Sequence, residues 1–486
     1  MISLETEEFG AIGKFQRDLF EGRNSCEEAT RKEISNISRY NREFNAFITL
    51  FDREEDIAFS EARRLDKKLS GMRLGSLKEK ERRLHPLLPL PPLFGVLFSI
   101  KDNIFLKDRR TTAASGAFKD FVPKINAEVV DLIIRFGGII VGKTNLHELA
   151  LGATSSSSYF GPVRNPRDSS RISGGSSGGS AVSVALSDEK RLVSLGTDTG
   201  GSVRIPAALS GVFGFKPTLS SISTVGVFPL SATLDHVGIL ANSIQDISLV
   251  YHALSSAKKH DNSKSYDAPS KSKAKSQGLI RLGVASEFFT EEMDKYVSST
   301  FWAAVEKLKG FDDSIKVVDE VDVSICRKSY YPRRKIQLGE AAWFYKELIS
   351  SKSKRRLLQP DVRRLLDIGS KVGEIGQMFS QILRLEFALR LAKIFNEIDY
   401  LLTPTCPIVA PKLDDILGHE TGPARYLLIR NTEPFNLAGF PALSIPAPPS
   451  SSLVRGSLPV GIQIVGNFGE DEGVLRAGLL ISKILG

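Results

Sequence analysis

The segment GTDTGGSVRIP, residues 196–206, places three glycines and one serine in a single short turn. A second cluster, ISGGSSGGSAV, occupies residues 172–182. A flexible linker would have polar or repetitive flanks, but the apolar stretches SAVSVAL and LVSLGT adjoin these clusters. Both clusters are therefore expected inside packed structure.

Two nucleotide-binding explanations are not favoured by the spacing. A Walker phosphate loop needs a lysine and a hydroxyl residue after its last glycine, and GGSSGGSA lacks that lysine. A dinucleotide fingerprint needs the spacing Gly-x-Gly-x-x-Gly, which neither cluster contains. The remaining interpretation is a hydrolytic site.

Ser202 is the candidate nucleophile of that site. Glycine lets the backbone approach a reacting carbonyl closely, so backbone amides can stabilise an oxyanion. Thr199, Gly200 and Gly201 directly precede Ser202, and we predict that they form the oxyanion hole with the Ser202 amide. A serine hydroxyl also needs a base to take its proton.

No histidine lies in this region, and a desolvated lysine is the alternative base. Lys101 follows FGVLFSI, seven residues without a charge, which predicts a buried strand that carries the lysine into the interior. Burial disfavours the ammonium form and can lower its pKa by several units. Ser176 or Ser177 could then relay a proton between Ser202 and Lys101.

An ordered set of motifs carries a family resemblance over about residues 90–470. The motifs are FGVLFSIKDNI, GKTNLHELALG, FGPVRNP, GGSSGGSA, GTDTGGSVRIPA, GVFGFKPT, PLSATLDHVG, LLTPTCP and PFNLAGFPALSIP followed by PVGIQIVG. Together they resemble the amidase signature family. This resemblance implies amide hydrolysis through a serine acyl-enzyme, with no metal or organic cofactor.

The resemblance also implies a role for each matching residue. It makes Ser202 the nucleophile, Ser176 the bridging serine after a cis Gly175–Ser176 bond, and Lys101 the base. Asp198 and Arg204 match positions that hold the nucleophile loop by charge pairing. The two serines lie two residues farther apart than is usual in the family, which leaves Ser177 as the alternative bridge; the position relative to the glycine pair favours Ser176.

Short apolar strands that alternate with helical stretches predict an α/β fold, with a twisted mixed sheet flanked by helices on both faces. We expect an N-terminal helical region over residues 1–75, without strand alternation, packed on the core. The amidase signature core spans residues 76–486. It contains a low-complexity loop at 258–278 and a helical elaboration at about 285–395.

The composition indicates which partners and which cellular compartment to expect. The net charge of +9 is concentrated in loop-like segments without interleaved aromatic residues, so no nucleic-acid partner is expected. Three widely separated cysteines suit a reducing cytoplasm. The start of the chain has no signal-peptide pattern. The proline-rich stretch 86–99 is too short to cross a membrane and is expected in the sheet rather than on a membrane surface. The expected partner is a small-molecule amide; the oligomeric state is open.

Three functions remain. A stand-alone amidase is preferred over the A subunit of a tRNA-dependent amidotransferase because of three departures from those subunits. Ile429 stands where the subunits carry an aspartate, the helix before LLTPT contains no tyrosine, and His236 replaces a glutamine. The third possibility is a non-catalytic binding member of the family, which the complete set of triad residues disfavours.

Overall fold

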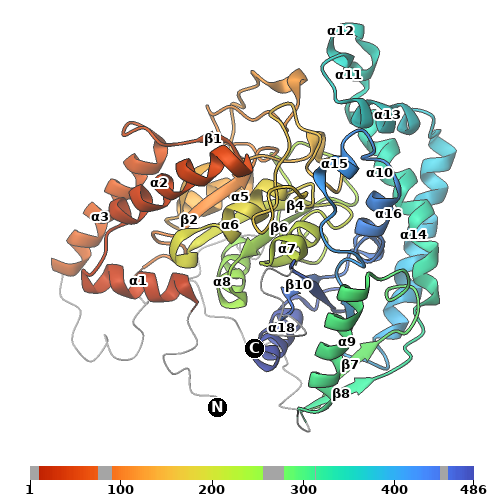
Figure 1. Ribbon diagram of the computed structural model, residues 1–486. Helices are drawn as coiled ribbons and strands as arrows, with labels where there is room; N and C mark the ends of the chain where they lie inside the picture. The colour runs from red at the N-terminus through yellow and green to blue at the C-terminus, as the bar shows by residue number, and fades with distance from the viewer. Residues whose placement is uncertain (1–9, 75–89, 256–278, 312–313, 449–457) are drawn as a thin grey trace, which may run out of the picture.

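A computed structural model describes residues 10–74, 90–255, 279–311, 314–448 and 458–486 (Figure 1). Eleven strands form one sheet in the order β1-β3-β2-β4-β6-β5-β10-β11-β9-β7-β8. The strands are β1 (Phe47–Leu50), β2 (Leu97–Lys101), β3 (Ile139–Thr144), β4 (Leu192–Asp198), β5 (Phe213–Lys216), β6 (His236–Ala241), β7 (Ile280–Val284), β8 (Ile315–Val318), β9 (Tyr400–Pro404), β10 (Ala442–Pro446) and β11 (Gly461–Val465).

The sheet is mixed, as predicted. Strand β2 pairs in parallel with β3 and β4, and β7 pairs in parallel with β8 and β9. The remaining pairs are antiparallel. Strands from distant parts of the chain meet at the centre of the sheet, where β5 pairs with β10.

Helices cover both faces of the sheet. The side chains along β6, which point alternately to one face and the other, show this. Leu240 packs in a cluster with residues of α6 (Gly178–Ala185) and α7 (Arg204–Ser210). Val237 and Ile239, which point to the opposite face, belong to the large cluster that includes α8 (Ile244–Ser255) and α18 (Asp471–Leu485). The small residues of α6 and α7 let these two helices lie close to the sheet.

The N-terminal region is not entirely helical. Helices α1 (Ala11–Glu21), α2 (Cys26–Phe44) and α3 (Ile57–Leu74) are accompanied by β1, which pairs antiparallel with β3. The prediction of helices without a strand was wrong at this point. Four residues are too few to show alternation, and the strand depends on pairing with a distant neighbour.

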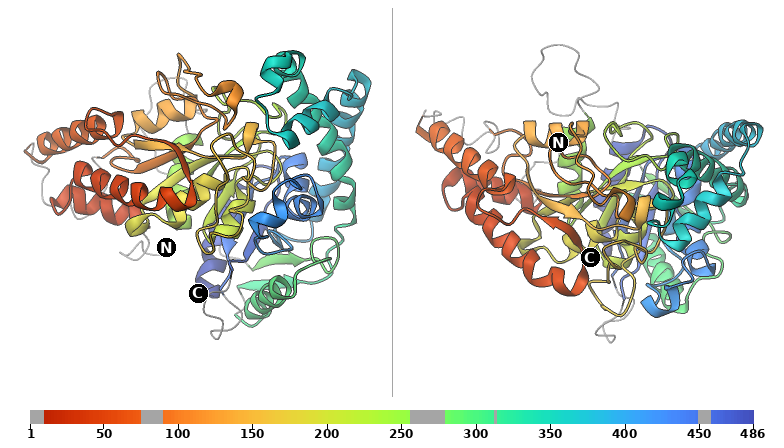
Figure 2. Two further views of the ribbon diagram at one scale, coloured as in Figure 1. Left: turned by 45° about the horizontal axis from the view of Figure 1, so that its top comes forward. Right: turned by 90° about the horizontal axis from the view of Figure 1, so that it is seen from above.

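The predicted helical elaboration lies on the opposite side of the sheet from α1–α3, as Figures 1 and 2 show together. It includes α9 (Lys295–Lys309), α10 (Tyr330–Phe344), α11 (Lys346–Ser350), α12 (Lys352–Arg355), α13 (Pro360–Gly369) and α14 (Glu374–Ile394), and it also contains β8. The predicted loop 258–278 lies outside the described residues. Within the described ranges, no helix is both long enough and apolar enough to span a membrane.

Candidate active site

Lys101 and the loop after Asp198 meet because β2 and β4 are parallel neighbours, whose carboxyl ends lie at the same edge of the sheet. The Lys101 side chain is fully buried. Its Nζ lies 2.7 Å from Oγ of Ser176 and 2.8 Å from Oγ1 of Thr197. The strand register thus places a buried amine against one serine of the upstream cluster.

The two candidate bridging serines have different partners. The Gly175–Ser176 peptide bond is cis, and Ser176 Oγ is the hydroxyl next to Lys101. Ser177 Oγ instead donates to the Thr197 carbonyl at 3.1 Å and accepts from the Thr197 amide at 3.3 Å. This geometry favours Ser176 over Ser177 as a relay.

Ser202 lies beside this pair. The Ser177 amide donates to the Ser202 carbonyl at 3.1 Å, which fixes the two glycine-serine segments to one another. Ser202 is 8% exposed, so a substrate can reach only a small part of it. Among the hydrogen bonds between described residues, none joins Oγ of Ser202 to Oγ of Ser176. Such contacts often tighten only when substrate binds.

A buried carboxylate organises the nucleophile loop. Asp198 accepts from the amides of Gly201 and Val203 at 2.8 and 3.0 Å. It also pairs with Nη2 of Arg204 at 3.0 Å, and both side chains are fully buried. Burial opposes ionisation of Asp198, but the Arg204 guanidinium, together with Lys216 and the hydrogen bond from Asn436, outweighs burial and holds the pKa of that carboxyl well below its usual range.

The backbone amides near Ser202 are unequally available. The Gly201 amide is held by Asp198, so it would have to leave that bond to stabilise an oxyanion. Thr199 is fixed through its side chain, since its Oγ1 donates to Asp235 at 2.5 Å. Among the predicted oxyanion-hole residues, Thr199 and Gly200 are therefore better candidates than Gly201.

Burial suits Lys101 to act as a base. Desolvation lowers the pKa of Lys101 to about 7, although the carboxylates of Asp198 and Asp235 oppose that shift. A pKa in this range leaves an appreciable share of neutral amine near neutral pH.

Residues not assigned from the sequence complete the arrangement. Thr197 contacts Lys101, and Asp235 holds Thr199. Asn436 donates to Asp198 at 2.8 Å, while Gln463 accepts from Nη1 of Arg204 at 2.7 Å. All four residues belong to motifs quoted above, and this membership is the only sign in the sequence that they lie near the site. Their contacts could not be predicted, because these depend on the order of distant strands.

We expect Arg204→Met to lower the free energy of unfolding by about 3–5 kcal/mol, because it leaves the buried Asp198 carboxylate without its cation. Urea unfolding measures this loss. The double variant Arg204→Met with Asp198→Leu is the control, and it should lose less than the single variant. Equal losses would show that the charge pair is not the source of the effect.

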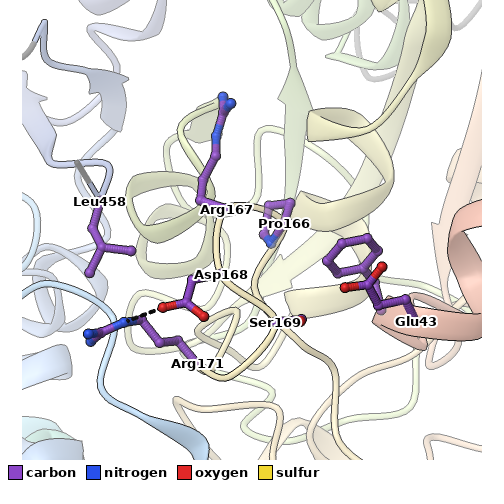
Figure 3. A pocket seen from close by; sticks show the side chains of 8 residues that line it. Glu43, Pro166, Arg167, Asp168, Ser169, Arg171 and Leu458 are labelled. Atoms are coloured by element: carbon purple, nitrogen blue, oxygen red, sulfur yellow. Dashed lines mark hydrogen bonds and ion pairs between the residues drawn. The ribbon is translucent and has the colours of Figure 1, made fainter. Parts of the chain in front are cut away.

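A separate hollow lies on another part of the surface (Figure 3). It is lined by Glu43, Phe44, Pro166, Arg167, Asp168, Ser169, Arg171 and Leu458. None of the side chains around Lys101 and Ser202 lines it. Asp168 and Arg171 within it pair with each other at 2.9 Å, and we assign it no part in the chemistry.

Similar proteins include the A subunits of amidotransferases and a solved amidase. The A subunit of the glutamyl-tRNA(Gln) amidotransferase of Sulfurisphaera tokodaii is 30% identical over 496 residues, covering 98% of each chain. A solved amidase structure matches with a TM-score of 0.81 and 31% identity, over 98% of this chain and all of that chain. The solved A subunit of the amidotransferase of Thermotoga maritima matches with a TM-score of 0.69 and 27% identity, over 93% of this chain and 90% of that one.

These relatives correct the predicted partners. The prediction that a small-molecule amide is the only partner, with no nucleic acid, was wrong, because the name of the curated relatives designates one subunit of an enzyme that acts on a tRNA. The relatives also support the alternative function, that of an amidotransferase A subunit, better than the stand-alone amidase that the three sequence departures favoured. Those departures are local, whereas the similarity extends over nearly the whole chain.

The family assignment rests on the length of the match as well as on the motifs. The family model described as Amidase matches residues 28–475, and the fold agrees with a solved amidase over nearly its full length. The chain is accordingly an enzyme that acts on amide C–N bonds. It belongs to the amidase family.

Proposed function

We propose that the chain hydrolyses an amide through an acyl-enzyme on Ser202, with Ser176 as the proton relay and Lys101 as the base. The observation that carries this proposal is the 2.7 Å contact between a fully buried lysine and Ser176, beside the Ser202 loop. No surface role accounts for an amine buried in this way.

The proposed reaction has two halves. Neutral Lys101 accepts the proton of Ser176, which accepts the proton of Ser202, and Ser202 Oγ bonds to the amide carbon. Backbone amides, including that of Gly200, stabilise the resulting oxyanion. The C–N bond then breaks, and the proton returns through Ser176 to the leaving nitrogen, which departs as ammonia or an amine. Water, deprotonated along the same path, releases the acid and restores Ser202.

The proposed substrate is glutamine, with the chain acting as the A subunit of a tRNA-dependent amidotransferase. The names of the curated relatives support this assignment. A cytoplasmic location belongs to the same proposal, since Cys26, Cys326 and Cys406 are all free thiols. We also propose that residues 76–486 form one core on which residues 1–75 pack.

Ammonia release measures this function. The purified chain is assayed with glutamine and with a panel of aliphatic, aromatic and amino-acid amides, alone and together with partner subunits and glutamyl-tRNA. Release of ammonia from glutamine that rises when the partner subunits and glutamyl-tRNA are added is the expected result. Release from simple amides that equals or exceeds release from glutamine, and that the partner subunits leave unchanged, would instead support the second candidate below.

The second candidate is an amidase that acts without partner subunits. Ile429, which is 8% exposed, cannot pair with the α-ammonium group of glutamine, although the amidotransferase subunits carry an aspartate there. The fold also matches the solved amidase with a TM-score of 0.81, against 0.69 for the solved A subunit. These two observations make the panel of simple amides a necessary part of the assay.

A further inference from the structure

Arg425 is a buried guanidinium that makes no hydrogen bond or ion pair with the described part of the protein, although the Asp361 and Glu433 carboxylates are near enough to interact with it electrostatically. It lies on α16 (Pro423–Arg430) and is only 7% exposed. Its Nε has no hydrogen-bond partner, and no ion pair between described residues includes it. Taking a cation out of water is costly unless a partner compensates for the lost hydration. Such a group is a candidate for binding an anion that arrives with the substrate.

The face of α16 that carries Arg425 lies toward the nucleophile loop. Ile429 lies one turn after Arg425, hence on the same face of the helix. A methyl group placed on Cα of Gly200 would lie 3.8 Å from Cγ2 of Ile429 and 3.4 Å from Nη1 of Arg333. Helices α16 and α10 therefore both face the residues directly before Ser202. The Tyr330 and Tyr426 rings also meet, with centroids 5.6 Å apart.

The charges around Arg425 do not balance. Arg333 has its own carboxylate, since its Nε lies 2.6 Å from Oε2 of Glu433. Asp361 is held by His147 at 2.9 Å and by Ser157 at 2.8 Å. Burial, together with the nearby Arg333 guanidinium, lowers the pKa of Arg425 to about 10, so the group still carries its charge at neutral pH. In the described part of the chain, the three cations Arg333, Arg334 and Arg425 thus face two carboxylates, Glu433 and Asp361, which leaves one positive charge in excess beside the nucleophile loop.

We propose that Arg425, assisted by Arg333, binds a carboxylate on the substrate, so that the enzyme prefers amides whose acyl part carries an acidic group. A guanidinium matches a carboxylate with two parallel hydrogen bonds, and the bound anion would balance the excess charge. This inference rests on the proposed amide hydrolysis and names its substrate class. Glutamine satisfies it through the α-carboxylate, and the half-amides of dicarboxylic acids satisfy it as well.

The test compares matched amides on matched variants. Succinamate and butyramide differ in the carboxylate, and glutamine tests the amino-acid case. The wild type is expected to show a higher kcat/KM on succinamate than on butyramide. Arg425→Met is expected to lose about 10–100-fold in kcat/KM on the amides that carry a carboxylate, while its turnover of butyramide stays unchanged. Arg425→Lys should recover part of the loss. Arg430→Met is the control, because this guanidinium on the same helix contacts Glu292 and the Glu291 carbonyl.

Two further readouts separate the possible failures. Labelling of Ser202 by a neutral fluorophosphonate should be equal in the wild type and in Arg425→Met. The thermal midpoint of Arg425→Met should be equal or higher, because an uncompensated buried charge is removed. Equal losses on succinamate and butyramide would overturn the carboxylate site while leaving amide hydrolysis intact. Absence of both turnover and labelling in the wild type would overturn the proposed function instead.

An independent observation concerns the outer face of α14. Six large apolar side chains form a stripe along this helix, namely Ile375 (80% exposed), Met378 (62%), Phe379 (54%), Ile382 (54%), Leu385 (67%) and Leu389 (71%). Their spacing places them on one face. The opposite face is buried against the protein through Ser380, Phe387 and Leu391. Figures 1 and 2 show α14 at the outer edge of the molecule.

A second copy of the chain fits this stripe. If two α14 helices cross antiparallel about a two-fold axis at Ile382, Ile375 of one copy faces Leu389 of the other. Side chains of about 200 Å² each, exposed by half or more, add up to roughly 600–800 Å² per copy, close to the area of a standard interface.

We propose that α14 pairs with α14 of a second copy to form a two-fold dimer. Sedimentation velocity over a dilution series should show a dimer for the wild type and a monomer for Ile382→Asp. Val225→Asp, an exposed apolar position elsewhere (56% exposed), should remain dimeric. A monomeric wild type, or a dimer that survives Ile382→Asp, would overturn the proposal.

Discussion

Ser202→Ala is expected to remove amide turnover, with a loss of about 10⁵–10⁶-fold in kcat. The hydroxyl of Ser202 is the only proposed site of the covalent bond, so Lys101 and Ser176 have no nucleophile to activate without it. Ammonia release measures the turnover. Intact mass after reaction with a fluorophosphonate measures the covalent step, and the Ser202→Ala protein should gain no mass.

A buried serine in the same segment provides the matched control. Ser210 ends α7, and its Oγ has no hydrogen-bond partner among the described residues, so Ser210→Ala removes a hydroxyl without removing a contact seen there. This variant should keep its turnover and its labelling. If Ser202→Ala were labelled as fast as the wild type, the nucleophile would be another residue and the proposed acyl-enzyme would be wrong.

The catalytic candidates could be proposed from the sequence because short local patterns mark them. Glycines around Ser176 and Ser202 mark tight turns, and a charge-free strand before Lys101 marks burial. The partners of these residues were not accessible in the same way. Asn436 and Gln463 reach Asp198 and Arg204 only because β10 and β11 join the centre of the sheet, and strand order is a property of the whole chain.

In the fold, too, local features could be predicted and long-range pairing could not. Alternating strands and helices predicted a mixed sheet with two covered faces, which is what the structure contains. The short strand β1 was missed because it exists through its pairing with β3. At position 429 the sequence shows only that Ile429 lacks a carboxylate. The structure adds Arg425 one turn earlier on the same helix face, so a neighbouring residue contributes to the charge beside the site.

The activity of the wild type is expected to rise with pH and to level off above about pH 7. Only neutral Lys101 can accept the proton from Ser176, and burial lowers the pKa of Lys101 to about 7. Below that value kcat/KM should fall about tenfold per pH unit, as the amine becomes protonated. Lys101→Met should lose about 10²–10⁴-fold on the plateau above pH 7 and lose the pH dependence with it, so its difference from the wild type should shrink as the pH falls. Initial rates on a substrate whose own charge is constant over this range measure the profile.

Asp235 allows the assignment of this profile to Lys101 to be tested. Its carboxylate stabilises the ammonium form and so raises the pKa of Lys101. Asp235→Asn removes that charge but keeps an oxygen that can accept from Thr199, so the midpoint of the profile should move to lower pH. A purely structural role for Asp235 would lower the plateau without moving the midpoint. A midpoint that stays in place would assign the titration to a group other than Lys101, because every buried amine near a removed carboxylate must become easier to deprotonate.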